Sequence, residues 1–139
     1  MPVPNRSFVV DLDVSNQNNN GKPGWINVKG SDNHDYWYKY SGGNHAEKNG
    51  HVTHTIGHGD ATVTVNLYTD YYEIDVVNFA GDNHGQLSAT GAGKYTRTIT
   101  NTCTAAMEGS YKVRVRGSGT TINKEVLIVC DPLIRNVPA

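Results

Sequence analysis

Apolar side chains recur at every second position along much of this 139-residue chain. In the segment 62–68, Val63, Val65 and Leu67 alternate with Thr and Asn, and the segment 111–117 repeats the pattern with Tyr and Val. Successive side chains of a β-strand point to opposite faces, so this alternation predicts strands with one buried and one solvent-exposed face. Strands of this kind are typical of antiparallel sheets.

Nine segments show this period of two, some of them only briefly. They are residues 7–13, 25–29, 36–40, 52–56, 62–68, 72–79, 95–101, 111–117 and 125–130. Runs rich in Gly, Asn and Asp separate them and supply the backbone conformations of turns. The sequence therefore predicts an all-β fold, an antiparallel immunoglobulin-like β-sandwich of about 7–9 strands, with a β-barrel as the alternative.

The length fits one domain that spans residues 1–139. The formal net charge of −1 and the isoelectric point near 6.6 predict no general attraction to nucleic acid or to anionic membranes. No run of apolar residues is long enough for a transmembrane helix, and the first residues include no hydrophobic signal segment. We therefore expect no membrane span and either a cytoplasmic or a mature secreted protein.

The two cysteines, Cys103 and Cys130, follow or end predicted strands. If the segments 95–101, 111–117 and 125–130 alternate in direction, both cysteines fall at the same end of the sandwich. A disulfide between them would stabilise the fold by about 3 kcal/mol through the unfolded state. It would require an oxidising compartment, and two independent thiols are the alternative.

Three histidines, His51, His54 and His58, lie within eight residues of one another. Imidazoles at short spacing can bind zinc, nickel or copper. However, residues three apart on a strand point to opposite faces, so His51 and His54 would diverge. Surface histidines, with His54 next to the core, are the alternative, and we expect no cofactor.

The aromatic residues Trp25, Tyr36, Trp37, Tyr38 and Tyr40 are the better candidates for ligand binding. The three tyrosines share one strand face and Trp37 lies on the other, so one of these faces should be partly exposed. Exposed rings beside Asn and Asp suit the apolar faces and hydroxyl edges of sugars, and they suit protein partners equally well. The alternative is that the tyrosines line the interior of the sandwich.

Lys112, Arg114 and Arg116 share one face of a predicted strand and form a basic stripe. Glu73 and Asp75, on the solvent-exposed face of another strand, could neutralise the stripe in a cross-strand charge ladder.

Signatures of catalysis are missing from the sequence. It contains no GxSxG motif, no phosphate-binding loop and no dinucleotide fingerprint. Carboxylate pairs such as Asp11 and Asp13 lie on single strands, without the opposing wall that a glycosidase needs. We therefore predict that the protein is not an enzyme.

The C-terminal third has a recognisable pattern. Residues 109–115 read GSYKVRV, and residues 126–134 read VLIVCDPLI. This ending resembles the closing strands of small bacterial sandwich proteins with an immunoglobulin- or cupredoxin-like fold that carry no copper. Together with the opening VVDLD at residues 9–13, it resembles the inclusion-body proteins of the AidA/PixA type. The resemblance implies an accessory or binding role and identifies no site residue.

The leading hypothesis is a non-enzymatic β-sandwich that binds a glycan or a protein partner through an aromatic and polar surface. One alternative is a metal-binding module built on the three neighbouring histidines. The other is a structural protein that assembles into homo-oligomers through strand edges or the tyrosine face.

Overall fold

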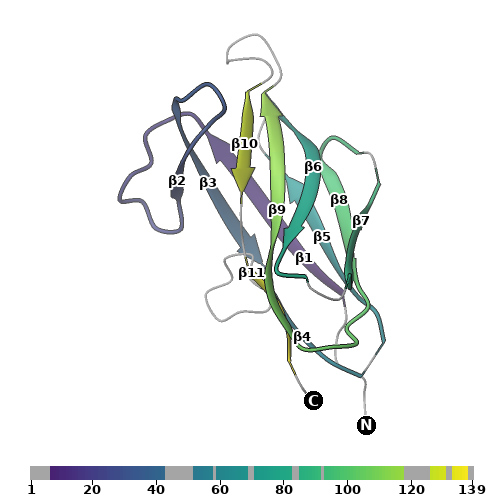
Figure 1. Ribbon diagram of the computed structural model, residues 1–139. Coiled ribbons are helices and arrows are strands. Elements are labelled where there is room, and N and C mark those ends of the chain that lie inside the picture. The colour runs from purple at the N-terminus through teal and green to yellow at the C-terminus, as the bar shows by residue number, and fades with distance from the viewer. Residues whose placement is uncertain are drawn as a thin grey trace.

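The structure is a computed structural model, and it describes most of the chain. The described residues are 7–42, 52–57, 59–68, 71–82, 85–91, 93–117, 126–130 and 133–137. They form eleven strands and no helix (Figure 1). The strands are β1 (Ser7–Ser15), β2 (Ile26–Lys29), β3 (Asp35–Gly42), β4 (Val52–Thr55), β5 (Ala61–Leu67), β6 (Tyr72–Ala80), β7 (Leu87–Thr90), β8 (Thr96–Asn101), β9 (Met107–Gly117), β10 (Leu127–Cys130) and β11 (Leu133–Val137).

The strands form two sheets that pack face to face (Figure 1). Sheet A has the order β2-β3-β1-β5-β8-β7. In sheet B, the long strand β9 pairs with β6 along one edge and with β10 and β11 in succession, and β4 lies beyond β11. Neither sheet closes on itself, so the prediction of an all-β sandwich is confirmed and the barrel alternative is wrong.

Two strand pairs run parallel, which the sequence reading did not foresee. β1 pairs with β5 in parallel, with Val10 opposite Val65, and β11 pairs in parallel with β4, with Ile134 opposite Val52. A parallel pair needs a crossover between its strands. The chain makes this crossover by leaving sheet A after β3, forming β4 in sheet B and returning as β5.

Two strands were also missed, and a third was predicted too short. β7 reads LSAT and β11 reads LIRNV, and neither sequence alternates apolar and polar residues. β9 begins at Met107 rather than at Tyr111, because Gly109 and Ser110 interrupt the apolar alternation although the backbone stays extended. The backbone of Gly109 lies so close to that of Ala80 on β6 that no side chain fits there.

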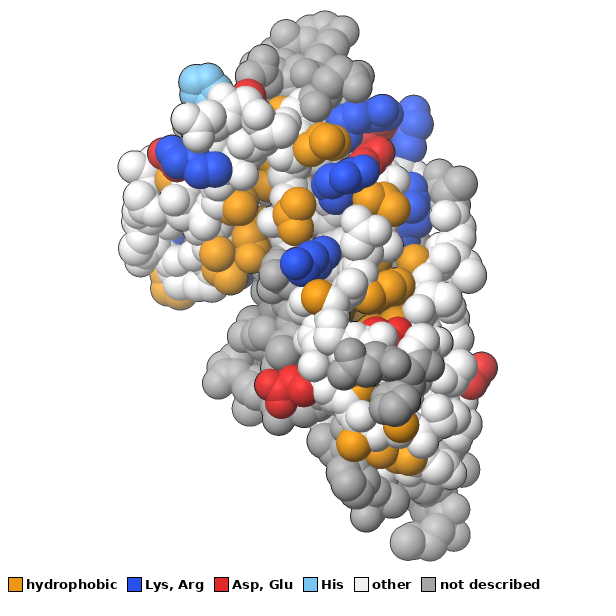
Figure 2. All heavy atoms as spheres, in the orientation of Figure 1, with side chains coloured by type: hydrophobic (Ala, Val, Ile, Leu, Met, Phe, Trp, Pro, Cys, Tyr) orange, Lys and Arg blue, Asp and Glu red, His pale blue; other side chains and the backbone are white. Residues whose placement is uncertain are grey.

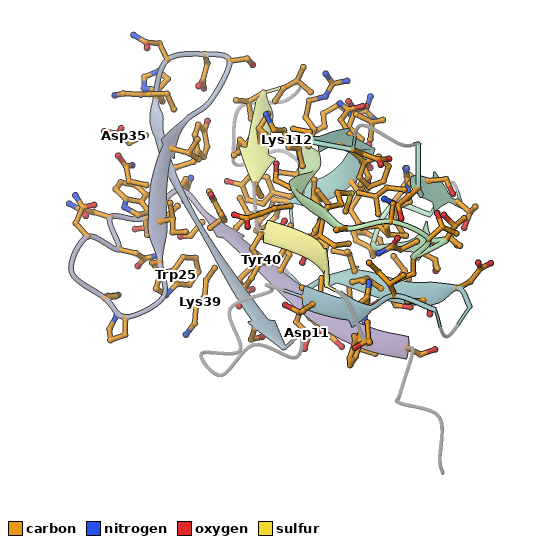
Figure 3. All side chains as sticks on the ribbon, turned by 60° about the horizontal axis from the view of Figure 1, so that its bottom comes forward. Asp11, Trp25, Asp35, Lys39, Tyr40 and Lys112 are labelled. Atoms are coloured by element: carbon orange, nitrogen blue, oxygen red, sulfur yellow. The ribbon has the colours of Figure 1, made fainter. Side chains whose placement is uncertain are left out.

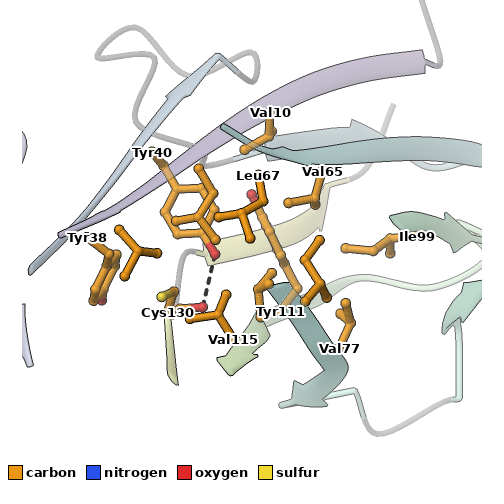
Figure 4. Packing of buried hydrophobic residues seen from close by; sticks show 14 of the residues in the cluster. Val10, Tyr38, Tyr40, Val65, Leu67, Val77, Ile99, Tyr111, Val115 and Cys130 are labelled. Atoms are coloured by element: carbon orange, nitrogen blue, oxygen red, sulfur yellow. Dashed lines mark hydrogen bonds between the residues drawn. The ribbon is translucent and has the colours of Figure 1, made fainter. Parts of the chain in front are cut away.

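The core lies between the sheets and includes three tyrosines in contact (Figure 4). Tyr111 of sheet B is completely buried and meets the ring of Tyr40 of sheet A edge to face, with 6.0 Å between ring centroids. Tyr38 makes a similar edge contact with Tyr40 at 5.9 Å. The Tyr40 hydroxyl donates a buried hydrogen bond of 3.0 Å to the backbone oxygen of Cys130 on β10, so one side chain links both sheets.

Both cysteines are buried and are not bonded to each other, which corresponds to the alternative of two independent thiols. Cys130 ends β10 and pairs with Val113, six residues beyond Met107 at the start of β9. That separation is about 20 Å at roughly 3.3 Å per residue. Cys103 lies before the start of β9, with its Sγ 3.5 Å from the backbone oxygen of Thr55. The two cysteines lie apart because β10 stops opposite the middle of β9 instead of reaching its end.

We expect Tyr40→Phe to lower the free energy of unfolding by about 1 kcal/mol, because it removes a buried hydrogen bond but keeps the ring contacts. Urea denaturation followed by fluorescence measures the change. Tyr95→Phe, at a side chain that is 54% exposed, is the matched control. An equal effect of both substitutions would show that the Tyr40 hydroxyl does not stabilise the sheet packing.

Candidate functional site

The predicted aromatic surface is mostly inside the protein. Tyr36, Tyr38 and Tyr40 point into the core and are only 4–6% exposed, and Trp37 on the other face is 5% exposed. Of the five predicted ligand-binding residues, only Trp25 is partly exposed. The alternative reading, in which the three tyrosines line the sandwich interior, describes their positions correctly.

Trp37 is buried on the outer side of sheet A because the loop 16–25 folds back over it. The indole Nε1 donates a hydrogen bond of 2.9 Å to Oδ1 of Asn20. Asn19 is also buried, and its backbone oxygen accepts a hydrogen bond from the amide of Lys22. The Asn-rich segment is therefore an ordered cover over Trp37 on the outer face of β3.

Beside this loop, a row of side chains crosses the outer face of sheet A. Lys39 of β3 lies opposite Asp13 of β1 in the strand register. Continued by one residue, the β2–β3 register places Trp25 beside Lys39, and the β1–β5 register places Tyr68 beside Asp13. The Tyr68 amide donates a hydrogen bond of 3.0 Å to the backbone oxygen of Leu12. We call these four residues the Trp25–Tyr68 row. Its ends lie about 14 Å apart, since neighbouring strands are roughly 4.8 Å apart.

The methylene groups of Lys39 are confined by a neighbouring loop. Gly24 has φ +83°, and a Cβ built there would lie 3.1 Å from Cε of Lys39, so the loop packs against the lysine methylenes. Figure 3 shows Lys39 next to Trp25, on the side of the molecule opposite Lys112. The Lys39 side chain is partly buried, and no carboxylate of the described residues lies within ion-pairing distance of it.

Asp11 lies in the next row of the same face, opposite Ser41 of β3 and Asn66 of β5. Its Oδ1 atom is buried and accepts no hydrogen bond within the described part of the chain. Lys39 is its diagonal neighbour across the strand pair, and no ion pair joins the two side chains. The outer face therefore offers a cation and a carboxylate oxygen that do not satisfy each other.

Sequence reasoning missed Lys39, Asp11, Asp13 and Tyr68 as site residues, although a signal for them existed. All four belong to the strand phase opposite to the buried one. The prediction instead chose the aromatic residues on the buried face of β3, because the alternation of side chains does not tell which face of a strand is covered.

Of the predicted metal ligands, His51 and His58 lie outside the described residues. His54 is 2% exposed, and its ring stacks on Phe8 with centroids 5.5 Å apart. Its Nδ1 lies 2.8 Å from Nδ2 of Asn101, which joins β4 of sheet B to β8 of sheet A. Among the described residues no group of three His, Cys, Asp or Glu is placed to hold a metal ion.

Asn101 is the centre of this buried polar cluster. Its Oδ1 accepts a hydrogen bond of 3.0 Å from the amide of Cys103, so its Nδ2 faces Nδ1 of His54 as the donor. Cysteine, histidine and asparagine occur together in some hydrolases, but here all three are at most 2% exposed. A substrate cannot reach them, and their role in this structure is to join the sheets.

We expect Asn101→Ala to lower the free energy of unfolding by about 2 kcal/mol or more, because two buried polar groups lose a partner. Thermal and urea denaturation measure the loss. Asn78→Ala, at an exposed position of β6, is the control and should change stability by less than about 0.5 kcal/mol. Equal small effects would contradict a structural role for Asn101.

The basic stripe of sheet B is part of a charge ladder, as predicted. Arg114 contacts Asp75 at 2.6 Å, and Arg116 pairs with Glu73. Figure 2 shows Lys and Arg side chains over β9 and β6 with acidic side chains among them. Arg97 does not join the stripe, because its guanidinium instead bonds to the backbone oxygens of Ile74 and Asp75 across the sandwich.

The ladder makes stability depend on pH. A hydrogen bond from Arg116 lowers the pKa of Glu73 below its ordinary value of 4.5, against the opposing effect of burial. A carboxyl whose folded-state pKa is lowered stabilises the fold above its unfolded pKa, and this stabilisation is lost as the pH falls through the folded pKa.

We therefore expect the wild-type free energy of unfolding to fall below pH 4.5, and to fall less steeply in Glu73→Gln. Urea denaturation at a series of pH values measures both slopes. Glu108→Gln, at an exposed position, is the control and should follow the wild-type slope. If the free energy of unfolding falls equally steeply with pH in wild type and in Glu73→Gln, Glu73 is not the group responsible for the pH dependence.

No protein-family model matches the chain, and it has no significant match among curated proteins. The resemblance to AidA/PixA proteins thus stays a prediction. Within the described residues, no helix is long and apolar enough to cross a membrane.

Proposed function

We propose that this protein is a non-enzymatic module that binds a glycan on the outer face of sheet A. The observation that carries the proposal is the Trp25–Tyr68 row, in which two aromatic side chains flank a lysine and an aspartate. Tyr68 is 68% exposed and Trp25 is partly exposed, so a ligand can contact both side chains.

The chemistry of the row suits sugars. Aromatic rings cover the apolar C–H faces of a sugar ring, while fixed polar groups select its hydroxyls. The span of about 14 Å between the ends of the row leaves room for several linked rings, with strands roughly 4.8 Å apart. Asp11, one row away on the same face, adds a partly buried carboxylate beside the row.

The loop 16–25 supports the proposal because it holds one end of the row in place. The Trp37–Asn20 hydrogen bond and the buried Asn19 anchor the loop on the sheet. A site whose groups are already ordered binds with a smaller loss of conformational entropy.

We expect Trp25→Ala and Tyr68→Ala each to weaken glycan binding at least about tenfold, the loss of roughly 1.4 kcal/mol of contact energy. A glycan array followed by calorimetry on the best ligand measures the change. Tyr95→Ala is the matched control, since Tyr95 is similarly exposed but lies in the opposite strand phase.

Unchanged affinity in both row variants, or an equal loss in the Tyr95 control, would reject the outer face as the site. If no glycan binds the wild-type protein, the proposal is wrong and a protein partner becomes the next candidate.

A second candidate is self-assembly through the edge of sheet A. β2 is one of the two edge strands in the described part of sheet A, and its Ile26 is 51% exposed. Exposed apolar edge strands are sites of strand pairing between molecules. Light scattering would show an oligomer that Ile26→Lys dissociates.

A further inference from the structure

We propose that the glycan carries an acidic group, a carboxylate or a sulfate, and that Lys39 binds it. This inference rests on the proposed function and adds the chemical class of the ligand. The observation that carries it is the ammonium of Lys39, which lies in the Trp25–Tyr68 row without a carboxylate partner among the described residues.

Of the four other lysines in the described part of the chain, Lys29 and Lys94 form ion pairs, and Lys22 and Lys112 form none. Lys29 pairs with Asp35 at 2.9 Å, and Lys94 lies 3.8 Å from Glu73. Both are more than half exposed, with 59% and 69% of their side chains accessible. Lys39 and Lys112 are both partly buried without such a pair. Lys39 also lies beside Trp25 in the Trp25–Tyr68 row, where a bound glycan would bring an anion to it.

The position of the Lys39 ammonium is restricted by its neighbours. Its methylenes pack against Gly24, where any side chain would crowd them at 3.1–3.5 Å. The loop that carries Gly24 and Trp25 is held to the sheet through Trp37. Because this long side chain is already confined, an anion would form a charge-assisted hydrogen bond with little further loss of side-chain entropy.

The charges of the outer face also give the ligand a direction. Asp11 and Asp13 lie on β1, between Lys39 on β3 and Tyr68 at the end of β5. These carboxylates repel an anion and accept hydroxyl hydrogens. The acidic group therefore lies at the Trp25 end of the row, and neutral hydroxyl-bearing rings extend over β1 toward Tyr68.

The test compares oligogalactans, oligogalacturonates and sulfated oligogalactans of one length and linkage by calorimetry. Wild-type protein should bind at least one acidic series about tenfold or more tightly than the neutral series. Lys39→Gln should remove this preference, so that the variant binds its acidic and neutral series with equal affinity. Lys29→Gln, which removes a paired and exposed lysine, should keep the preference. The two acidic series show whether a carboxylate or a sulfate fits better.

The preference should also weaken with added salt, because an ion pair near the surface is screened. Equal affinity for neutral and acidic oligosaccharides, or a preference that survives Lys39→Gln, would overturn this inference and leave the proposed function intact. Absence of binding to every glycan, including those of the wider array, would overturn both. Thermal denaturation of Lys39→Gln confirms that the variant is folded, so a lost preference is a property of the site.

Discussion

The edge-to-face contact between Tyr40 and Tyr111 connects the two sheets, and much of the architecture depends on it. Aromatic pairs in this geometry contribute beyond the area they bury. Tyr40 adds a hydrogen bond to the backbone of Cys130, so sheet A is tied to β10 as well as to β9. Because this contact and the apolar residues around it use the inner face of β3, the outer face of that strand is left to the loop 16–25 and to Lys39.

The outer face therefore divides into a covered part and an open part. Trp37 and Asn20 fix the cover over β3. Next to it, the Trp25–Tyr68 row offers two rings, a lysine and an aspartate, and no ion pair joins this lysine to a carboxylate of the described residues. Sheet B is different, because its Arg114 and Arg116 are already paired with Asp75 and Glu73. A charged side chain that is already in an ion pair attracts a charged ligand less strongly. We therefore place the candidate site on sheet A.

The buried polar groups explain why several conspicuous sequence features are structural. His54 and Asn101 bond across the sheets in the interior, and the Asn101 side chain also satisfies the backbone of Cys103. Arg97 bonds to backbone oxygens of β6 from sheet A. Burying such groups is costly unless they are paired, so their partners are as much a part of the fold as the apolar core.

The period of two in segments such as 62–68 and 111–117 was sufficient to predict an all-β sandwich, its main strands and the charge ladder. These features depend on neighbours in sequence and on side chains that alternate between faces. The parallel pairs, the free cysteines and the cover over Trp37 depend instead on which distant segments meet. A strand pattern does not say where β10 stops along β9, nor which loop lies on which face. Only the tertiary structure decided that Tyr36, Tyr38 and Tyr40 are core and that Lys39, Asp13 and Tyr68 share a surface, because burial is a property of the assembled sheets.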